Sequence, residues 1–237
     1  MRISVIIPSL NEAAHITAAI KSAADRNSAF SPSEIIVADG GSTDGTREVA
    51  AASGARVIEA PKGRAVQMNT GAEAASGGIF LFLHADTLLP KGYDMLVRSA
   101  ASLPATAAGA FTLKFNKANR GMTAIESLAN WRSRRLGMPY GDQAIFMRAD
   151  IFSALGGFKE MPIMEDFELM RRARRFGDII TLPVPALTSG RRFHKLGVLR
   201  AALINQAVIL GYLAGVQPER LAEFYKSGDK GLSDVIL

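Results

Sequence analysis

Three short clusters of polar residues each follow an apolar run of the chain, and each contains a carboxylate. They are residues 8–12 (PSLNE), 39–44 (DGGSTD) and 84–86 (HAD). Ligands of open α/β sheets bind beyond the carboxyl ends of the strands. Because all three clusters occupy that position in the sequence, we expect them to meet at one edge of one sheet and to form one site.

Two of these carboxylates, Asp39 and Asp86, suit different ligands. Asp39 can accept hydrogen bonds from a nucleobase or a ribose hydroxyl, and its alternative role is to cap the turn that follows it. Asp86 leaves a strand too apolar to hold an unpaired carboxylate. It suits Mg²⁺ or Mn²⁺, which take one or two protein oxygens together with substrate phosphates. His84 shares the side of Asp86 if the strand continues; it either faces the ribose or the metal, or is a buried structural histidine.

An acidic pair, Glu165-Asp166, opens a predicted helix. Two acids in a first helical turn interact favourably with the helix dipole, which alone could explain them. The apolar residues 161–164 before the pair would also hold one carboxylate in a partly dry cleft, where it could act as a base. From the residues alone, both interpretations stay open.

Three arginines and one polar turn also have positions that suit binding. Arg64 begins a predicted helix, and it either pairs with phosphate or ribose or is a solvated helix-end side chain. Arg191 and Arg192 lie in a predicted loop after the last strand, where they could meet leaving-group phosphates. Residues 140–143 (YGDQ) either contact an acceptor or form a tight turn.

The elements that must position these residues alternate regularly over the first ninety positions. Apolar runs predict strands at residues 3–7, 34–38, 56–59 and 79–84. Helices are expected between them, the first with Asn11 as its N-cap and with Ile16 and Ile20 on its buried face. Asp44 suits the first turn of the second helix. Continuous apolar strands alternating with helices are typical of a parallel sheet covered on both faces.

The alternation loosens after Pro90. The expected elements are a helix at 92–102, a strand at 109–115, a basic helix around Trp131, a strand at 143–148, the charged helix from Glu165 and two closing helices. We predict a single domain over residues 1–226. It comprises a nucleotide-binding half (1–90), an acceptor and catalytic half (91–192) and C-terminal helices (193–226), followed by a flexible tail at 227–237.

Composition excludes several classes of protein. A chain of 237 residues can bury a sizeable core without crosslinks, and the absence of cysteine removes disulfides, thiolate nucleophiles and zinc sites built on sulfur. A formal net charge of +6 with 48% hydrophobic residues does not fit a disordered polyelectrolyte. The apolar run at residues 3–7 is too short for a signal peptide, so a cytoplasmic location is expected.

Residues 198–216 (VLRAALINQAVILGYLAGV) are almost long enough to resemble a membrane span. Arg200, Asn205 and Gln206 interrupt the segment, whereas a spanning helix needs about 20 mostly apolar residues. A helix packed on the core is one interpretation. The basic residues 191–195 (RRFHK) suit an anionic surface, so peripheral contact with the inner face of the membrane is the other.

Taken together, these motifs resemble the family-2 glycosyltransferases of the GT-A fold. The segment S-V-I-I-P-S-L-N-E is similar to the first strand and nucleotide loop of that family. I-I-V-A-D-G-G-S-T-D-G-T is similar to its second strand and base-binding Asp, here Asp39. F-L-H-A-D-T stands where the family has its D-x-D motif, and M-E-D resembles its acidic motif, whose Asp, here Asp166, is the catalytic base. The resemblance covers residues 2–192. More narrowly, the L-H-A-D-T, G-D-Q and N-Q…G-V-x-P-E-R segments are similar to a small branch associated with arsenosugar biosynthesis.

This resemblance implies an α/β fold of the GT-A type, with a Rossmann-like, mostly parallel sheet, helices on both faces and additional C-terminal helices. It implies an inverting, metal-dependent transferase that moves a sugar from a nucleoside-diphosphate sugar, expected to be a UDP-sugar, to an acceptor hydroxyl. The acceptor is unknown and is either a small molecule or lipid-linked. Nucleic acid is not an expected partner.

The same interpretation assigns a role to each candidate residue. Asp166 is the base, Asp86 holds Mn²⁺ or Mg²⁺, and the donor nucleotide is bound by Pro8, Ser9, Glu12, Asp39, Arg64, His84 and Arg191. Two departures from the family pattern matter. His84 replaces the first Asp of the D-x-D motif, so metal binding depends on Asp86. A Q-x-x-R-W motif is absent from the sequence, which argues against a processive polysaccharide synthase.

Two alternatives remain on the sequence alone. A nucleotidyltransferase shares the α/β start and the metal carboxylates, but it would normally have a Gly- and Arg-rich first loop, unlike residues 8–12. A non-catalytic basic domain could dock on membranes or nucleic acid through its arginine clusters. That domain would bind with steep salt dependence and would need no metal.

Overall fold

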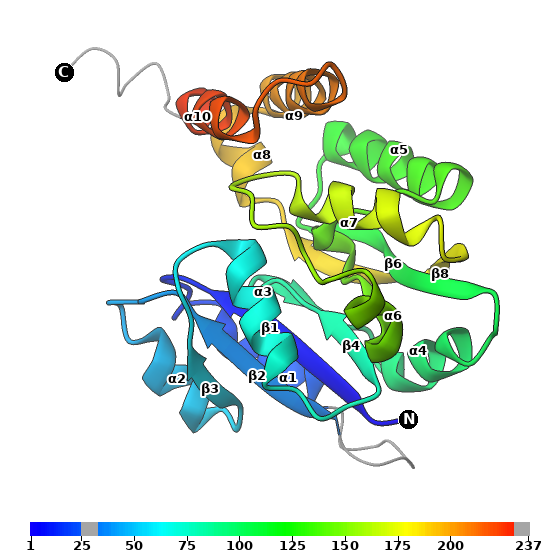
Figure 1. Cartoon of the computed structure of the whole chain (residues 1–237). Coiled ribbons are helices and arrows are strands. Elements are labelled where there is room, and N and C mark those ends of the chain that lie inside the picture. The colour runs from blue at the N-terminus through cyan, green and yellow to red at the C-terminus, as the bar shows by residue number, and fades with distance from the viewer. Residues whose placement is uncertain (25–32, 230–237) are drawn as a thin grey trace.

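The computed structural model describes residues 1–24 and 33–229. Its strands form one eight-stranded sheet in the order β3-β2-β1-β4-β7-β6-β8-β5 (Figure 1). The strands are β1 (Ile3–Ser9), β2 (Glu34–Asp39), β3 (Arg56–Glu59), β4 (Ile79–Phe82), β5 (Thr87–Leu88), β6 (Thr106–Asn116), β7 (Phe146–Arg148) and β8 (Asp178–Ser189). The helices are α1 (Ile16–Ala23), α2 (Thr46–Ala52), α3 (Arg64–Glu73), α4 (Tyr93–Ala101), α5 (Arg120–Leu136), α6 (Ala149–Ala154), α7 (Glu165–Ala173), α8 (Arg191–Leu196), α9 (Val198–Leu213) and α10 (Pro218–Asp229).

The first half of the sheet is parallel, as the alternation of strands and helices predicts. β1 pairs in parallel with β2 and with β4, and β2 pairs in parallel with β3. The second half is mixed, because β7 runs antiparallel to both β4 and β6 while β6 and β8 are parallel to each other. The carboxyl ends of β1, β2 and β4 therefore meet at one edge, where the three polar clusters follow them.

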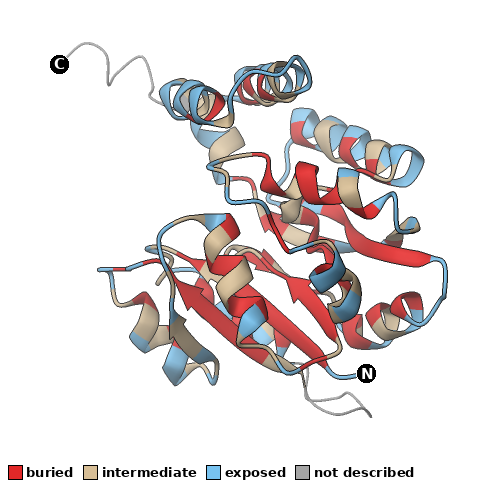
Figure 2. Cartoon of the chain, viewed as in Figure 1, coloured by how far each residue is buried: buried red, intermediate tan, exposed pale blue. Residues whose placement is uncertain are grey.

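Both faces of the sheet are covered, which explains why its strands are apolar at successive positions. In β1, Ile3, Val5 and Ile7 pack into one core together with α1 and α4. Ile6 points to the opposite face and packs into a second core together with α3, α6 and α7. Figure 2 shows the central strands buried along their length. Successive side chains of a strand alternate between faces, so a strand buried on both sides has no polar face.

The predicted N-cap of the first helix is wrong. α1 begins only at Ile16, and Asn11 lies well before it with a φ of 55°. Asn11 instead joins two loops: its side-chain oxygen accepts a hydrogen bond from the N–H of Thr43 (2.9 Å), and its own N–H donates to Ser42 Oγ (2.8 Å). Asn tolerates the left-handed conformation that this position requires. The predicted burial of Ile16 and of Ile20 is confirmed.

Three other segments differ in the structure from their predicted bounds or type. β4 ends at Phe82, so the strand does not continue through His84. The strand predicted from residue 143 begins at Phe146, because residues Gly141–Gln143 form a 3₁₀ turn held by Gln143, whose amide donates to the carbonyl of Phe111 (2.9 Å). Arg191 and its neighbours form α8 where a loop was predicted, with Gly190 ahead of the first turn.

The C-terminal segment forms three helices rather than two, and α9 and α10 pack on each other. One face of α9, with Ala201, Ile204 and Val208, is buried, as the core-packing interpretation expects. α10 includes residues 227–229, which were predicted to belong to a flexible tail; the rest of that prediction, residues 230–237, lies outside the described residues. Among the residues that the structure describes, none of the helices is both long enough and apolar enough to cross a membrane.

Candidate active site

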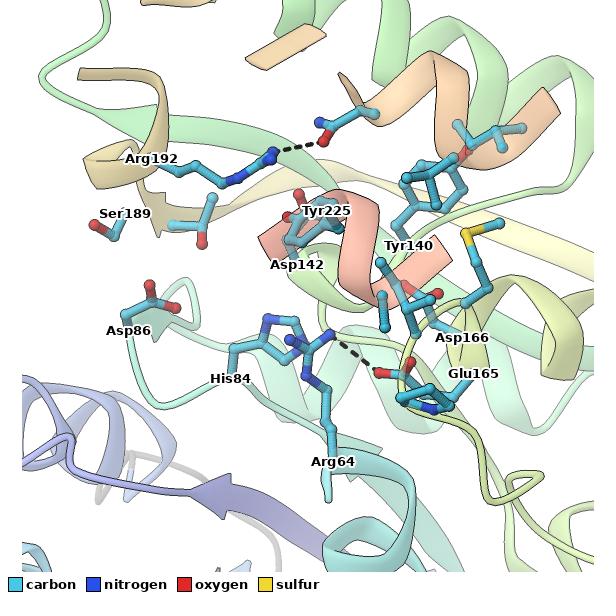
Figure 3. A pocket seen from close by; sticks show the side chains of 18 of the residues that line it. Arg64, His84, Asp86, Tyr140, Asp142, Glu165, Asp166, Ser189, Arg192 and Tyr225 are labelled. Carbon is cyan, nitrogen blue, oxygen red and sulfur yellow. Dashed lines mark hydrogen bonds and ion pairs between the residues drawn. The ribbon is translucent and has the colours of Figure 1, made fainter. Parts of the chain in front are cut away.

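A cavity of about 460 Å³ lies between the carboxyl edge of the sheet and the C-terminal helices (Figure 3). Its polar lining comes from loops and helices that are far apart in the sequence. The ionisable residues that matter most are Arg64, His84, Asp86, Asp142, Glu165 and Asp166. The cavity brings together the HAD cluster, the predicted acidic pair and the YGDQ turn, whereas the clusters at residues 8–12 and 39–44 contribute none of its lining residues.

The Asp39 turn is not part of the cavity lining and is held by its own hydrogen bonds. Asp39 is 1% exposed and pairs in register with Ser9 of the neighbouring strand. One carboxylate oxygen accepts from the N–H groups of Gly41 (3.1 Å) and Ser42 (2.8 Å), and the other from the hydroxyls of Ser9 (2.9 Å) and Ser42 (2.5 Å). Burial raises the pKa of Asp39, but these hydrogen bonds together outweigh burial and leave the pKa below its ordinary value. The carboxylate therefore caps its turn with all four acceptor positions in use.

Asp44 is structural, as the sequence predicts, but it precedes Gly45, the N-cap of α2, and does not lie in the first turn of that helix. One oxygen accepts from the N–H of Thr46 (3.0 Å), and the other accepts from the N–H of Ala13 (3.1 Å). These bonds fix the start of α2 against the first loop. They hold the pKa of Asp44 below its ordinary value, with the hydroxyl of Thr46 as the largest cause.

Arg191 connects the first loop with the HAD cluster. Its guanidinium donates two hydrogen bonds to the carboxylate of Glu12 (2.6 and 3.1 Å), and Nη2 lies 3.3 Å from Oδ2 of Asp86. Burial raises the pKa of Asp86, although the charge of Arg191 opposes this effect. The hydrogen bonds from Arg191 to Glu12 raise the pKa of Arg191 in turn. The sequence placed Arg191 near phosphates, whereas here it neutralises two carboxylates.

His84 lines the cavity even though β4 ends before it. Burial, followed by the charges of Arg64 and Arg191, lowers the pKa of His84 to about 3. The imidazole is therefore neutral at physiological pH. It packs closely on Gly141, where an added Cβ would lie 2.7 Å from Nε2 of His84. A neutral ring can offer one nitrogen to a ligand and donate with the other.

Glu165 and Asp166 point to different partners, as neighbours in a first helical turn must. Glu165 is 2% exposed and forms an ion pair with Arg64, with 3.0 Å between Nη1 and Oε1. Burial raises the pKa of Glu165 against the opposing charge of Arg64. Asp166 accepts a hydrogen bond from the N–H of Gly141 on Oδ2 (2.7 Å) and faces the cavity. Asp166 is thus the more available carboxylate of the pair.

The sequence singled out Asp142 only as part of the YGDQ segment, without a role of its own. It lies in the 3₁₀ turn and lines the cavity, so the YGDQ segment is both a tight turn and part of the site. Its buried Oδ1 has no hydrogen-bond partner among the described residues. Burial raises the pKa of Asp142 to about 6, with Arg132 opposing and Asp166 reinforcing the shift. The sequence holds only a weak signal for this role, namely a carboxylate between Gly141 and Gln143.

The opposite wall of the cavity comes from the C-terminal helices, which sequence reasoning did not assign to the site. Arg192 donates to Oδ1 of Asn205 (2.6 Å), and its guanidinium carbon lies 3.9 Å from the centre of the Tyr225 ring. In contrast, Ser9 and Asp39 are not among the described residues that line the cavity. The site therefore has two parts, a turn region at β1 and β2 and a deeper cavity bounded by α7, α9 and α10.

The carboxylates of the cavity do not form a metal site made entirely of protein ligands. They fit a metal ion that is held partly by the protein and partly by substrate phosphates. In the described part of the chain, no three His, Asp or Glu side chains form a group that could hold a metal ion by themselves. Asp86 is a partly buried carboxylate that lines the cavity and forms an ion pair with Arg191. Mg²⁺ and Mn²⁺ need only one or two such oxygens when a diphosphate supplies others.

Known proteins are similar to this chain in sequence. A model of the family described as "Glycosyl transferase family 2" matches residues 4–156. The succinoglycan biosynthesis protein ExoA of Rhizobium meliloti is 31% identical over 194 residues, covering 73% of this chain and 58% of ExoA. Glycosyltransferase AglE of Haloferax volcanii is 35% identical over 91 residues, 35% of this chain and 30% of AglE. The chain thus spans less than two thirds of either relative.

Solved structures share the fold at low identity. A mannosyltransferase from Pyrobaculum calidifontis, determined with GDP-Man and Mn²⁺, is 20% identical with a TM-score of 0.66, covering 96% of this chain and 69% of the other. Glucosyl-3-phosphoglycerate synthase from Mycobacterium tuberculosis, with Mn²⁺, UDP and phosphoglyceric acid, is 21% identical with a TM-score of 0.61, covering 86% and 76%. The family match over well over half of the chain establishes that this protein belongs to glycosyl transferase family 2.

Proposed function

We propose that this protein is an inverting, metal-dependent glycosyltransferase that moves a sugar from a nucleoside-diphosphate sugar, with UDP as the expected nucleotide, to an acceptor hydroxyl. The observation that carries the proposal is the cavity in which Asp86 and Asp166, from distant segments, line the same space. The neighbouring folds determined with UDP, GDP-Man and Mn²⁺ support a nucleotide-sugar donor and a divalent metal. Family membership argues against the nucleotidyltransferase and the non-catalytic alternatives.

The donor nucleotide would lie along the first two loops. Asp39 would accept a hydrogen bond from the base or ribose, with Pro8 and Ser9 beside it. Since all four acceptor positions of Asp39 are in use, the hydroxyls of Ser9 and Ser42 would rotate away to admit the nucleotide. Hydroxyl groups rotate at little cost, so the backbone of the turn would stay as it is.

The diphosphate would lie between Asp86 and the arginines. Asp86 would hold Mn²⁺ or Mg²⁺, and a bound cation would neutralise charge that develops on the departing diphosphate. Arg191 would release Asp86 and turn its guanidinium toward the phosphates, while Glu12 keeps it within reach. His84, neutral in its buried position, would contact the ribose or phosphate. Arg64 would keep Glu165 paired at the side of the cavity.

Asp166 would act as the general base. The N–H groups of Gly141 and Phe167 donate to its two oxygens (2.7 Å each) and orient the carboxylate, and each oxygen keeps a lone pair for the acceptor hydroxyl. As Asp166 takes the proton, the acceptor oxygen forms a bond to the anomeric carbon and the bond from that carbon to the diphosphate breaks. This single in-line displacement inverts the anomeric carbon and needs no covalent nucleophile. Asp142, with an unpartnered buried oxygen nearby, would bind a second acceptor hydroxyl.

Substitution of Asp39 should affect both binding and stability. Asp39→Ala should lower nucleotide affinity at least tenfold, since a charge-assisted hydrogen bond contributes about 1.5–3 kcal/mol. It should also lower the melting temperature by about 5 °C, because four donors lose their acceptor. Calorimetry with UDP and thermal unfolding measure the two effects. Asp44→Ala is the matched control, which should lower stability but keep UDP affinity; equal UDP affinity in Asp39→Ala would contradict the base-binding role.

Substitution of Asp86 should separate metal binding from nucleotide binding. Asp86→Asn should bind UDP without metal about as well as the wild type, yet lose the increase in affinity that Mn²⁺ gives, because the amide lacks the charge that a hard cation selects. The measurement is calorimetry with UDP, with and without MnCl₂. His84→Ala should reduce the Mn²⁺ effect less. If His84→Ala removes that effect and Asp86→Asn keeps it, the metal assignment is reversed.

Substitution of Asp166 should slow sugar transfer without weakening the binding of the donor. Asp166→Asn should keep donor affinity while transfer falls by about 10²–10⁴-fold, the usual contribution of a general base. Glu165→Gln should reduce transfer less, because Glu165 points to Arg64. Single-turnover transfer with saturating donor, or donor hydrolysis until an acceptor is found, measures both. Near-normal turnover of Asp166→Asn beside an inactive Glu165→Gln would move the base to Glu165.

Asp142 should make stability fall as the pH rises. Its folded-state pKa of about 6 exceeds the ordinary value of 3.8, so the folded protein binds the proton more tightly and loses stability between about pH 4 and 6. Arg132, Asp166, Asp86 and Arg64 act on this carboxyl. Asp142→Asn should therefore melt at a higher temperature than the wild type at pH 7.5, and the gap should shrink at pH 4.5. A gap that is absent at pH 7.5 would show that Asp142 is not destabilised by its charge.

A further inference from the structure

The outer face of α9 consists mainly of leucine and is uncovered in the described structure. Leu199, Leu203, Leu210 and Leu213 are 74%, 60%, 65% and 57% exposed. With 100° between successive helical residues, these four leucines lie within an arc of about 80°, which also contains the exposed amide of Gln206. α9 buries only its inner face, and a row of exposed leucines on a surface helix marks an interaction site. Something else is therefore expected to cover the leucine row of Leu199, Leu203, Leu210 and Leu213.

The charge around the leucine row indicates what covers it. Residues 191–226, which span α8, α9 and the described part of α10 that packs on α9, hold six Lys and Arg side chains and two Glu. Lys195 and Arg200 are exposed beside the first turn of α9, and the two carboxylates, Glu219 and Glu223, belong to α10. A second copy of this chain would bring the same net positive charge to this surface. Basic side chains beside exposed leucines are instead the pattern of helices that lie on anionic lipid.

We propose that α9 docks through the leucine row on the surface of an anionic bilayer. The leucines enter the boundary between headgroups and acyl chains, while Lys195 and Arg200 meet the lipid phosphates. α9 lies flat and does not span the bilayer, in agreement with its 16 residues. In Figure 1, α9 and α10 lie at the end of the molecule away from α1, α2 and α3, so the nucleotide-binding half stays clear of the membrane.

Docking through α9 would also bring the cavity to the membrane. Asn205, Val208 and Ile209 on the inner side of α9 line the cavity, whereas the leucine row lies on the outer side. One helix, about 10 Å in diameter, thus separates the cavity from the bilayer. An acceptor hydroxyl carried on a lipid headgroup fits this position. That consequence rests on the proposed function, but docking itself does not.

Vesicle sedimentation without donor or metal tests docking separately from activity. Wild-type protein should pellet with phosphatidylcholine vesicles that contain 30% phosphatidylglycerol, bind at least tenfold more weakly to pure phosphatidylcholine, and lose affinity in 0.5 M salt. The double variant Leu203→Glu/Leu210→Glu should bind anionic vesicles at least tenfold more weakly. Leu103→Glu, at a leucine that is 51% exposed outside α9, is the matched control and should bind like the wild type.

Other outcomes would overturn the proposal. Wild-type protein that stays in the supernatant with anionic vesicles, or a double variant that binds them normally, excludes docking through the leucine row. A wild-type dimer that the double variant converts to a monomer, with no vesicle binding, would assign the row to self-association; light scattering after gel filtration measures this. The double variant could fail to fold, which circular dichroism would show. Lys195→Glu leaves the leucines intact and should then weaken binding to anionic vesicles at least threefold. Normal vesicle binding by Lys195→Glu contradicts the proposal.

Discussion

The site depends on the balance of charge among carboxylates that are crowded into a poorly hydrated space. Five acids meet around the cavity and its rim, namely Glu12, Asp86, Asp142, Glu165 and Asp166. A buried carboxylate is costly unless a cation or hydrogen bonds compensate it. Arg64 pairs with Glu165 across 101 positions of sequence, and Arg191 pairs with Glu12 across 179. These arginines therefore join the two halves of the chain at the place where a substrate would bind, and only Asp142 is left partly uncompensated.

The same balance explains how the acidic residues differ from one another. Asp39 is stabilised as a carboxylate by four neutral donors and needs no cation. Glu165 is tied to Arg64, which removes it from the reactive space. Asp166 accepts one backbone hydrogen bond on each oxygen, and Asp86 shares an arginine with Glu12. Chemically similar side chains thus acquire separate duties from their surroundings, which is how sites of this kind distinguish acids, bases and ligands.

The fold was largely predictable because its signals are local. The apolar strands, the order of elements through β4 and the start of α7 follow from periodicity and turn residues. The predicted strand at 56–59 coincides with β3, and the predicted acidic helix begins at Glu165 as observed. The position of Asn11 was missed because its partners lie some thirty residues away in the second loop, beyond any local capping rule. The 3₁₀ turn at Gly141–Gln143 was missed because three residues carry no periodicity.

Site residues that belong to local sequence motifs were predictable. Site residues that are placed by contacts between distant segments were not. Asp86, Glu165 and Asp166 line the cavity as their motifs indicate. Nothing local marks Arg191 as the partner of Asp86, or Asp142 as a buried acid without a partner, since both facts arise from packing between segments that fold together. Tyr225 and Asn205 reach the cavity only because α9 and α10 return to the sheet edge.

The wall that α9 and α10 contribute has an evolutionary consequence. The family match ends at residue 156, whereas these two helices form one side of the cavity after that point. Ser9 and Asp39, in the turn region at β1 and β2, are not among the described residues that line this cavity. Substitutions in α9 and α10 can therefore change the shape of the cavity without touching the Asp39 turn. Related chains can thus differ in what the cavity admits while the first two loops stay the same.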